Sequence, residues 1–383
     1  MAVATDIVGV VPELVTSRVF KVDGLLDDVE ADALSAVWHG FSPYRPSSAN
    51  RIGQRKPVRT ISGPMTTRAP GPVSQLGFET TLPARFDAGQ NFVRTGGRFG
   101  RLDQGRWASG NRNDYFRETY AAGGVIYVDR IEMLVDHRGL VDAARALFGL
   151  SVVVPIVVYS NILIPGQELG IHTDVPEFRI APGVRIPAWL RVVMRHSGLF
   201  EYWRVPIATA IVYLGEPVEG GAFAFYPDGA AGNAATIAPE PRCAVILDAD
   251  TVFHGVDLVG SVWMEPHSVE AGSRLVHRGD RRWTLFAAPD SGGAETGTFH
   301  SDGMRFSVSW KAACFADEGD RRCWAEHADD LPAASVIGTL TTELLARERL
   351  TTADHGLSND DLGRLLVDEF VRFPPPATAT PGQ

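Results

Sequence analysis

Three residues with metal-ligating side chains are spaced so that a single ion could be held between them. His172 and Asp174 stand two positions apart, shortly after an extended run at 152–164. On a β-strand, residues i and i+2 project from the same face, so both side chains could reach one metal. His254 follows a second apolar run, 244–248, and would supply the third ligand. Two imidazoles and one carboxylate on one side of an ion leave the other positions open, an arrangement typical of iron(II) sites that react with oxygen.

The segments around these residues must be strands for this geometry to hold. Short runs rich in β-branched, aromatic and small apolar residues recur through the middle of the chain, separated by the turn signals PG, GG, PDG and DG. This pattern predicts an antiparallel β-sandwich or barrel. The runs are 152–164, 208–214, 222–226, 244–248, 282–287 and 305–314.

Helices are expected on both sides of this β-rich part. Apolar residues at helical spacing predict helices at 24–40, 141–148, 325–348 and 357–372. We therefore expect a mainly β fold with flanking helices (α+β), divided into three parts. Residues 1–151 would form a helical and loop-rich covering region, residues 152–315 a β core, and residues 316–383 C-terminal helices followed by a disordered tail.

Three stretches of the β-rich part resemble a known family when taken together. They are ATAIVYLGEPVEGGAFAFYPDG, TIAPEPRCAVILDADTVFHGVDLV and DGMRFSVSWKAACF. They are similar to successive core strands of the prolyl-4-hydroxylase-like superfamily of 2-oxoglutarate- and iron(II)-dependent dioxygenases. In that family a strand ending in YL precedes GG, a later strand ends at HGV, and a Gly-x-Arg-x-Ser strand follows. The resemblance covers about residues 152–315, and it implies a double-stranded β-helix (jelly-roll, cupin-like) catalytic core that uses Fe(II), with 2-oxoglutarate as co-substrate.

The resemblance also assigns roles to individual residues. It implies that His172, Asp174 and His254 are the iron ligands. It implies that Arg305 binds the distal carboxylate of 2-oxoglutarate, because a planar guanidinium can hold a carboxylate through two parallel hydrogen bonds.

Three further residues are candidates for binding the co-substrate. Ser307 lies two residues beyond Arg305, on the same face of the expected strand, and could donate to the same carboxylate. Tyr159 and Asn161 share one face of the strand that leads to His172, where relatives often contact the co-substrate. Simple core packing is an equally good reading of these two.

The position of Arg305 departs from the family pattern. Arg305 follows His254 by 51 positions, whereas relatives usually carry this basic residue about ten positions after the second histidine. Either residues 258–302 are an insertion, or an earlier residue such as Arg274 or Arg282 binds the co-substrate. We favour Arg305 because its neighbours also fit the pattern, with Arg282 as the second choice.

The function implied is hydroxylation or a related oxidation of an unactivated C–H bond. In halogenating relatives a small residue replaces the ligand carboxylate to make room for chloride, and the presence of Asp174 disfavours that chemistry. Two other readings stay open: a zinc-type metal hydrolase, because His/Asp sets also hold zinc, and a non-catalytic β-barrel binding protein.

Charge bears on the substrate and the partners. The formal net charge of -10 and the pI near 5.5 argue against a nucleic-acid partner. Residues 41–118 nevertheless contain 13 Lys and Arg against 5 Asp and Glu. This basic segment is either a solvated loop surface or a lid over an anionic substrate. We expect a small molecule such as an amino acid, a peptide or a natural-product intermediate, and the oligomeric state is left open.

The cysteines and apolar runs favour a cytoplasmic protein without a membrane partner. Only three cysteines are present, which gives no disulfide framework and no CxxC zinc pattern. The apolar start of the chain lacks the basic residues of a secretory signal. No run reaches the roughly 18 apolar residues of a spanning helix.

Overall fold

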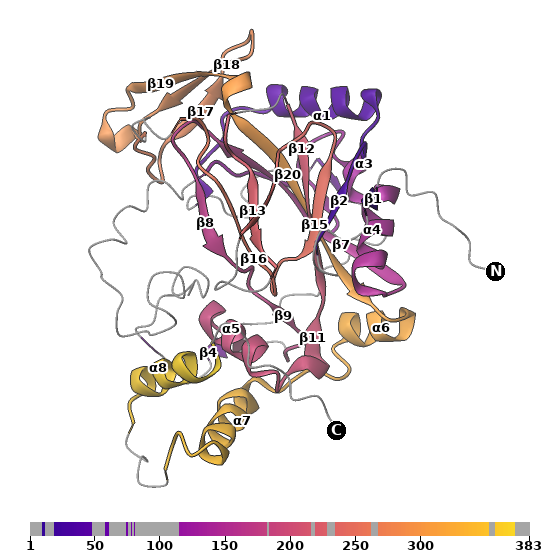
Figure 1. Cartoon of the computed structure of the whole chain (residues 1–383), viewed down its shortest axis with the longest axis vertical. Helices are drawn as coiled ribbons and strands as arrows, with labels where there is room; N and C mark the ends of the chain where they lie inside the picture. Colours follow the sequence, from indigo (N-terminus) through magenta and orange to yellow (C-terminus); the bar gives the residue numbers. More distant parts are fainter. Residues whose placement is uncertain are drawn as a thin grey trace, which may run out of the picture.

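Two antiparallel sheets dominate the computed structural model of the chain (Figure 1). The structure describes residues 10–11, 19–47, 58–60, 74–75, 78, 80, 115–181, 184–215, 219–227, 234–261, 267–351 and 357–371. The larger sheet has nine strands in the order β1 (Val10–Val11), β2 (Val19–Val22), β15 (Ala244–Asp248), β12 (Ile207–Leu214), β20 (Arg305–Phe315), β7 (Val152–Leu163), β5 (Thr119–Ala122), β6 (Val125–Ile126) and β3 (Arg59–Thr60). The smaller sheet has the order β14 (Ala235–Ile237), β13 (Phe223–Tyr226), β16 (Phe253–Val256) and β8 (Leu169–His172).

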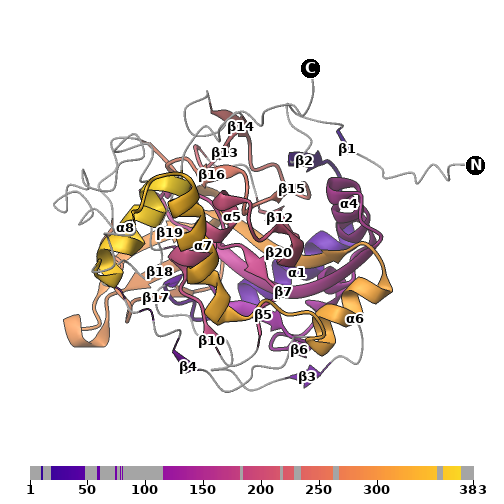
Figure 2. The same cartoon turned by 90° about the horizontal axis from the view of Figure 1, so that it is seen from below.

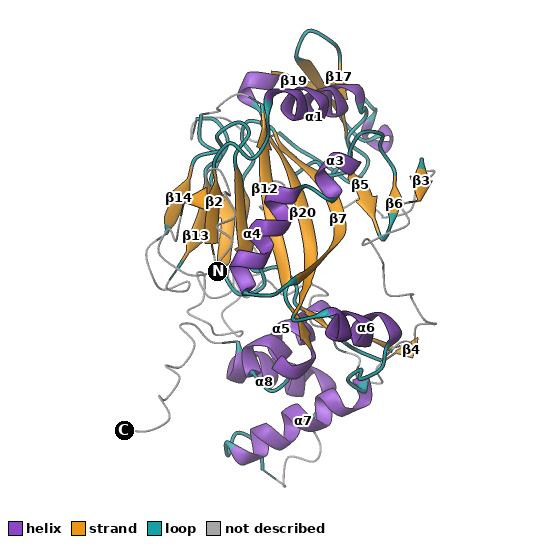
Figure 3. Ribbon diagram, turned by 90° about the vertical axis from the view of Figure 1, so that its right-hand side faces the viewer, coloured by secondary structure: helices purple, strands orange, loops and turns teal. Residues whose placement is uncertain are grey.

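Strand β20 shows how the larger sheet separates its two faces. Its alternate residues Phe306, Val308 and Trp310 belong to the largest apolar cluster, and Trp310 Nε1 donates to the carbonyl of Val135 (3.0 Å). Helices α1 (Asp28–Gly40), α3 (Glu132–Val135) and α4 (Arg138–Phe148) cover this outer face (Figure 3). The opposite face of β20 carries a row of polar side chains: Arg305, Ser307, Ser309 and Lys311. A period of two therefore turns one strand into an apolar outer layer and a polar inner one.

The inner face of the larger sheet packs against the smaller sheet. Tyr213 and Ile211 of β12 share an apolar cluster with Phe223 and Phe225 of β13. One part of the space between the sheets is thus filled by apolar side chains. The polar row of β20 lies on this same inner face, because Tyr213 pairs in register with Ser307 and Ile211 with Ser309.

Residues 267–302, within the expected insertion 258–302, form a small sheet of their own. Strands β17 (Arg274–His277), β18 (Arg282–Phe286) and β19 (Glu295–His300) pair antiparallel, and their Leu275, Trp283 and Phe299 join the outer apolar cluster. Two short 3₁₀ turns, Pro289–Ser291 and Ser301–Gly303, complete this part. The insertion lies near α1 at the upper end of Figure 1.

A second group of helices lies at the opposite end of the larger sheet (Figures 1 and 2). Helix α5 (Ala188–Ser197), α7 (Ala333–Ala346) and α8 (Asn359–Phe370) share one apolar cluster that includes Trp189, Leu340 and Phe370. A 3₁₀ turn, Glu201–Trp203, and two short pairings accompany them: β9 (Glu177–Phe178) with β11 (Arg204–Val205), and β4 (Ser74–Gln75) with β10 (Val184–Arg185). Among the described residues, no helix is long and apolar enough to cross a membrane.

The six expected strands are confirmed, with bounds that differ by at most one residue at either end. The expected helix at 325–348 is wrong as a single element. The chain instead forms α6 (Glu318–Glu326), which ends at His327 in the left-handed region, and α7, which begins after Pro332. A proline has no backbone N–H to continue a helix, so it separates the two. Most of the basic segment 41–118, and the tail after residue 371, lie outside the described residues.

Candidate metal centre

The structure brings His172, Asp174 and His254 together between the two sheets. Strands β8 and β16 are neighbours, and His172 pairs directly with His254. Their ring centroids are 4.4 Å apart. One ligand atom from each of the three residues lies within 4.8 Å of the others. Two imidazole nitrogens and a carboxylate oxygen at this spacing can hold one divalent ion.

Asp174 does not reach the site from the same strand as His172, as the i, i+2 spacing had suggested. Strand β8 ends at His172, so Asp174 lies beyond the strand. Its backbone N–H donates to the carbonyl of Ala249 (2.8 Å), in the turn between β15 and β16. The position of the carboxylate therefore depends on that turn as well as on its own strand.

Backbone carbonyls orient both imidazoles. His172 Nδ1 lies 2.8 Å from the carbonyl of Gly170, and His254 Nδ1 lies 2.8 Å from the carbonyl of Val252. A neutral imidazole that donates from Nδ1 has its lone pair on Nε2, which is then the ligating atom. Both side chains are buried. The rings are thus held in one orientation by the chain itself.

A lysine holds the carboxylate of Asp174. Lys311 Nζ lies 2.6 Å from Asp174 Oδ2. Burial alone would raise the pKa of Asp174, but the charge of Lys311 and the two imidazoles hold it well below its usual range. Burial alone would lower the pKa of Lys311, and Asp174 raises it instead. Asp174 is consequently ionised at neutral pH, as a metal ligand must be.

Arg305 is a buried cation on the same inner face. Its side chain donates to the carbonyl of Gly221 (2.8 Å), to Ser307 Oγ (3.2 Å) and to Tyr213 Oη (3.4 Å). Among the described residues, no carboxylate forms an ion pair with it, and burial lowers its pKa. A buried charge without a counter-charge is costly, so this site favours an anionic ligand.

The alternative basic residues do not reach this space. Arg282 lies on β18 with 62% of its side chain exposed, and its acidic neighbour is Asp280. Arg274 is exposed on β17, where its guanidinium lies 5.7 Å from the ring of Phe286. Both belong to the inserted sheet and not to the inner face of the larger one.

Tyr159 and Asn161 also line the inner face. They pair in register with Ser309 and Ser307 of β20. Asn161 Nδ2 donates to Ser309 Oγ (2.5 Å), whereas Asn161 Oδ1 is buried and has no hydrogen-bond partner among the described residues. Thr209 Oγ1 on β12 is likewise buried without a hydrogen-bond partner among the described residues. Unpartnered buried polar atoms call for an explanation, and an absent ligand is one.

Two basic residues close to Asp174 were not predicted from the sequence to belong to the site. Lys311 lies on β20 in register with Thr209. Arg117 precedes β5, and its guanidinium lies 3.7 Å from the centre of the Tyr159 ring. The charge of Asp174 contributes to the raised pKa of Arg117. Lys311 could have been found from its place in the inward-facing row of β20, but nothing in the sequence singles out Arg117.

A pocket of about 140 Å³ opens beside Asp174 and Lys311. It is lined by Ile156, Asp174, Val175, Glu177, Ile207, Thr209, Asp250 and Lys311. The pocket is adjacent to the proposed metal ligands and contains the unpartnered Thr209 Oγ1. It is therefore a candidate place for a small substrate.

In a second group of potential metal ligands, a lysine side chain already binds the carboxylates. Asp23, Glu240 and Cys243 also have ligand atoms within 4.8 Å of one another. Lys21 Nζ lies 2.9 Å from Asp23 and 2.7 Å from Glu240. This lysine binds both carboxylates, so the group is better explained as an ion-pair cluster than as a metal site.

Comparison with known proteins gives weak structural similarities only. No protein-family model and no curated protein matches the chain. Among solved structures, the chain is similar to the non-haem alpha-ketoglutarate-dependent epimerase SnoN from nogalamycin biosynthesis, at 12% identity and a TM-score of 0.35, with 77% of this chain and 78% of that one covered. A Pseudomonas putida prolyl-4-hydroxylase matches at 14% identity and a TM-score of 0.28, with 62% and 89% covered. The viral collagen prolyl hydroxylase from Paramecium Bursaria Chlorella virus-1 matches at 10% identity and a TM-score of 0.31, with 78% and 96% covered. Similarities this weak establish no activity, so any assignment depends on the side chains of this chain.

Proposed function

We propose that the chain is an iron(II)- and 2-oxoglutarate-dependent oxygenase with a double-stranded β-helix core at residues 152–315. The observation that carries the proposal is the combination of two features between the two sheets. One is the His172, Asp174 and His254 group, and the other is the buried Arg305, which has no carboxylate partner among the described residues. A metal site alone fits many enzymes, but a metal site together with a buried guanidinium between the same two sheets fits a metal-chelating diacid.

The donor set suits iron(II). Two neutral imidazoles and one carboxylate on one side of the ion leave room for a chelating co-substrate and for oxygen. When bound, iron and 2-oxoglutarate would supply the oxidising chemistry, with succinate and CO₂ as the co-products. His172, Asp174 and His254 would hold the metal, and Arg305 with Ser307 would hold the distal carboxylate. Asn161 and Tyr159 would complete the co-substrate site.

The protein's own contribution is position and the exclusion of water. Carbonyls of Gly170 and Val252 fix the imidazoles, and Lys311 keeps Asp174 ionised. The two sheets enclose the site, since His172, His254 and Arg305 are each no more than 6% exposed. A buried site of this kind protects a reactive oxidant from water.

We propose a small anionic molecule as the substrate, with hydroxylation of a C–H bond as the reaction. Iron(II), Arg305 and Lys311 would together carry four positive charges, against three negative charges from Asp174 and the 2-oxoglutarate dianion. A substrate with a carboxylate or phosphate group would balance this excess of positive charge.

Succinate formation tests this proposal directly. Purified chain is incubated with iron(II), labelled 2-oxoglutarate and oxygen, with and without panels of anionic and neutral small molecules. Succinate that depends on iron and oxygen, and that increases with an anionic compound, supports the proposal. Metal-dependent hydrolysis with zinc and without oxygen would favour a metal hydrolase instead.

A further inference from the structure

The turn between β15 and β16, together with the flanking strand residues 248, 253 and 254, is called the turn 248–254. Its backbone holds two of the three proposed iron ligands. The carbonyl of Ala249 accepts the N–H of Asp174, and the carbonyl of Val252 faces His254 Nδ1, both at 2.8 Å. His254 itself lies at the end of the turn. A shift of this turn would therefore move a carboxylate and an imidazole at the same time.

The turn is tight, and its acidic side chains are buried. The carbonyl of Asp248 accepts the N–H groups of Thr251 (3.1 Å) and Val252 (3.0 Å). Asp248 is fully buried, and Asp250 is 3% exposed. Two carboxylates this close and this deeply buried need a cation to be tolerated.

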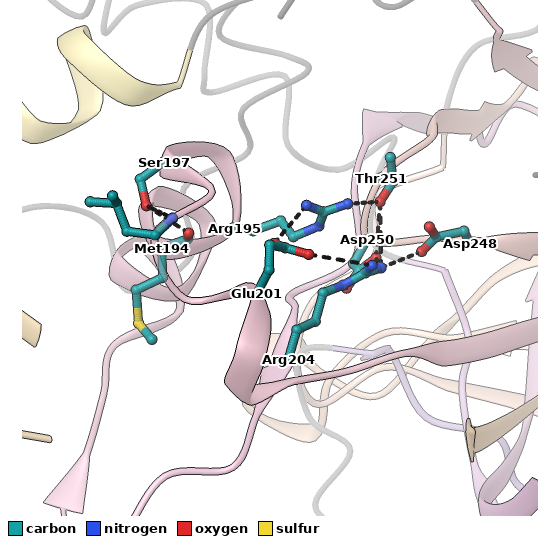
Figure 4. Close-up of polar contacts among 9 residues, drawn as sticks. Met194, Arg195, Ser197, Glu201, Arg204, Asp248, Asp250 and Thr251 are labelled. Atoms are coloured by element: carbon teal, nitrogen blue, oxygen red, sulfur yellow. Dashed lines mark hydrogen bonds and ion pairs between the residues drawn. The ribbon is translucent and has the colours of Figure 1, made fainter. Parts of the chain in front are cut away.

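Arg204 of β11 supplies that cation and binds both carboxylates (Figure 4). Its Nη2 lies 2.7 Å from Asp248 Oδ1 and 2.5 Å from Asp250 Oδ1, and its Nε lies 3.2 Å from Asp250 Oδ2. The contact with Asp250 is bidentate, a geometry that fixes orientation as well as charge. Arg204 thus spans the turn from its first residue to its third.

Arg195 of α5 adds a second contact to the same turn. Its Nη2 donates to Thr251 Oγ1 (2.7 Å), and its Nη1 pairs with Glu201 (2.8 Å) (Figure 4). Both arginines come from the segment between β8 and β12, which contains α5 and the Glu201–Trp203 turn. This segment is therefore connected to the metal ligands through the turn.

We infer that Arg204 is a positioning residue of the metal centre, which fixes the turn 248–254 so that its carbonyls orient Asp174 and His254. The inference rests on the proposed function for the identity of the metal. Side chains that hydrogen-bond to a metal ligand typically change the metal affinity by about 10–100-fold when they are replaced. Arg204 acts at a further step, through the backbone of the turn, so the expected effect is near the lower end of that range.

Arg179 provides a matched control. Its side chain is 9% exposed, as is that of Arg204, and it adjoins the same β9–β11 pairing. It binds Asp320 of α6 (2.7 Å), Asp329 (3.3 Å) and the carbonyl of Tyr202 (2.6 Å). It has the same kind of buried ion pairs, but these partners lie outside the turn 248–254.

The experiment compares Arg204→Gln, Arg204→Lys and Arg179→Gln with the wild type. Iron(II) dissociation constants are measured without oxygen by competition with a chromophoric chelator. Hydrogen exchange in the metal-free proteins reports the turn and the N–H of Asp174, and thermal unfolding reports global stability. Arg204→Gln should weaken iron binding about tenfold and accelerate exchange in the turn. Arg204→Lys should lie between Arg204→Gln and the wild type, and Arg179→Gln should lower the Tm while iron affinity stays within about twofold.

Unchanged iron affinity in Arg204→Gln, or equal losses in Arg204→Gln and Arg179→Gln, would overturn the inference. If Arg204→Gln does not fold, Thr251→Val removes the hydroxyl that binds Arg195 (2.7 Å) and that also contacts Asp250 (3.3 Å) and Arg204 (3.5 Å). It should accelerate exchange in the turn and weaken iron binding by a few fold, and no change in either would also overturn the inference. A wild type that binds no iron would contradict the proposed function instead, and the exchange measurement would still show whether Arg204 fixes the turn.

Discussion

Lys311 Nζ lies 2.6 Å from Asp174 Oδ2, so the carboxylate proposed as an iron ligand has a cationic partner on the central strand of the larger sheet. The same contact keeps the pKa of Asp174 low. One strand, β20, thereby carries both the residue that holds this ligand and Arg305, which we propose as the anchor for the co-substrate.

Replacing Asp174 should abolish iron binding without unfolding the protein. Asp174→Asn preserves the size of the side chain but removes the negative charge, and an amide is a much poorer iron ligand than a carboxylate. We expect loss of iron(II) binding in equilibrium dialysis and loss of succinate formation. His300→Gln is the control, because His300 lies on the inserted sheet with 50% of its side chain exposed. Equal losses in the two variants would show that the ligands are misassigned.

Replacing Arg305 should weaken 2-oxoglutarate binding and spare iron. Charge-assisted hydrogen bonds contribute about 1.5–3 kcal/mol each, so losing the guanidinium should raise the KM for 2-oxoglutarate by about 10–100-fold. Arg305→Lys should recover only part of this loss, because lysine cannot bind a carboxylate through two parallel N–H groups. Arg282→Met should leave the KM unchanged, and a larger effect at Arg282 than at Arg305 would reverse the assignment.

Removing the hydroxyl of Thr209 should weaken substrate binding without lowering the thermal stability of the metal-free protein. Thr209 Oγ1 is buried without a partner among the described residues, and Thr209 lines the pocket beside Asp174. Thr209→Val replaces an unsatisfied polar group with an apolar one of the same shape, so the Tm of the metal-free protein should stay the same or rise. If the pocket holds substrate, its KM should rise. A marked fall in Tm would show that the hydroxyl is satisfied in the native protein.

The buried Asp248 and Asp250 pair should make stability depend on pH. Burial, together with the neighbouring Asp248, raises the pKa of Asp250 to about 7. A carboxyl group with a raised native pKa stabilises the fold below its unfolded pKa of about 4, and this contribution is lost as pH rises towards 7. The free energy of unfolding, measured by urea denaturation, should therefore fall across this interval by at most about 1.4 kcal/mol per pH unit from this group.

Asp250→Asn is the matching variant, because it keeps the shape of the side chain and removes the proton uptake. Its unfolding free energy should vary less with pH between about 4 and 7 than that of the wild type. An identical pH dependence in the two proteins would contradict the assignment of the proton to this pair.

The strands were predictable because their signal is local. Runs such as 152–164 and 208–214 are apolar enough to be buried, and the structure confirms them as β7 and β12. Helix α5 was not predicted, and its apolar face packs in one cluster with the distant α7 and α8 and with Phe178 and Phe253. Contacts with remote helices cannot be recognised from the spacing of residues in one segment.

Some residues of the candidate site could also be predicted from the sequence, and others could not. His172, Asp174, His254 and Arg305 stand out because a few residue types at specific positions can bind a metal or a diacid. Arg204 and Asp250 lie 46 positions apart, and their pairing depends on how the α5 segment packs against the turn. Interactions of this kind are set by tertiary structure, and no local pattern predicts them.

Anaerobic titration of the metal-loaded protein with 2-oxoglutarate is the most direct test of the central claim. The account predicts that iron(II) binds at one site per chain, and that 2-oxoglutarate then produces a weak visible charge-transfer absorption that is absent in Asp174→Asn. A folded, iron-loaded protein that shows no such absorption at saturating 2-oxoglutarate would contradict it.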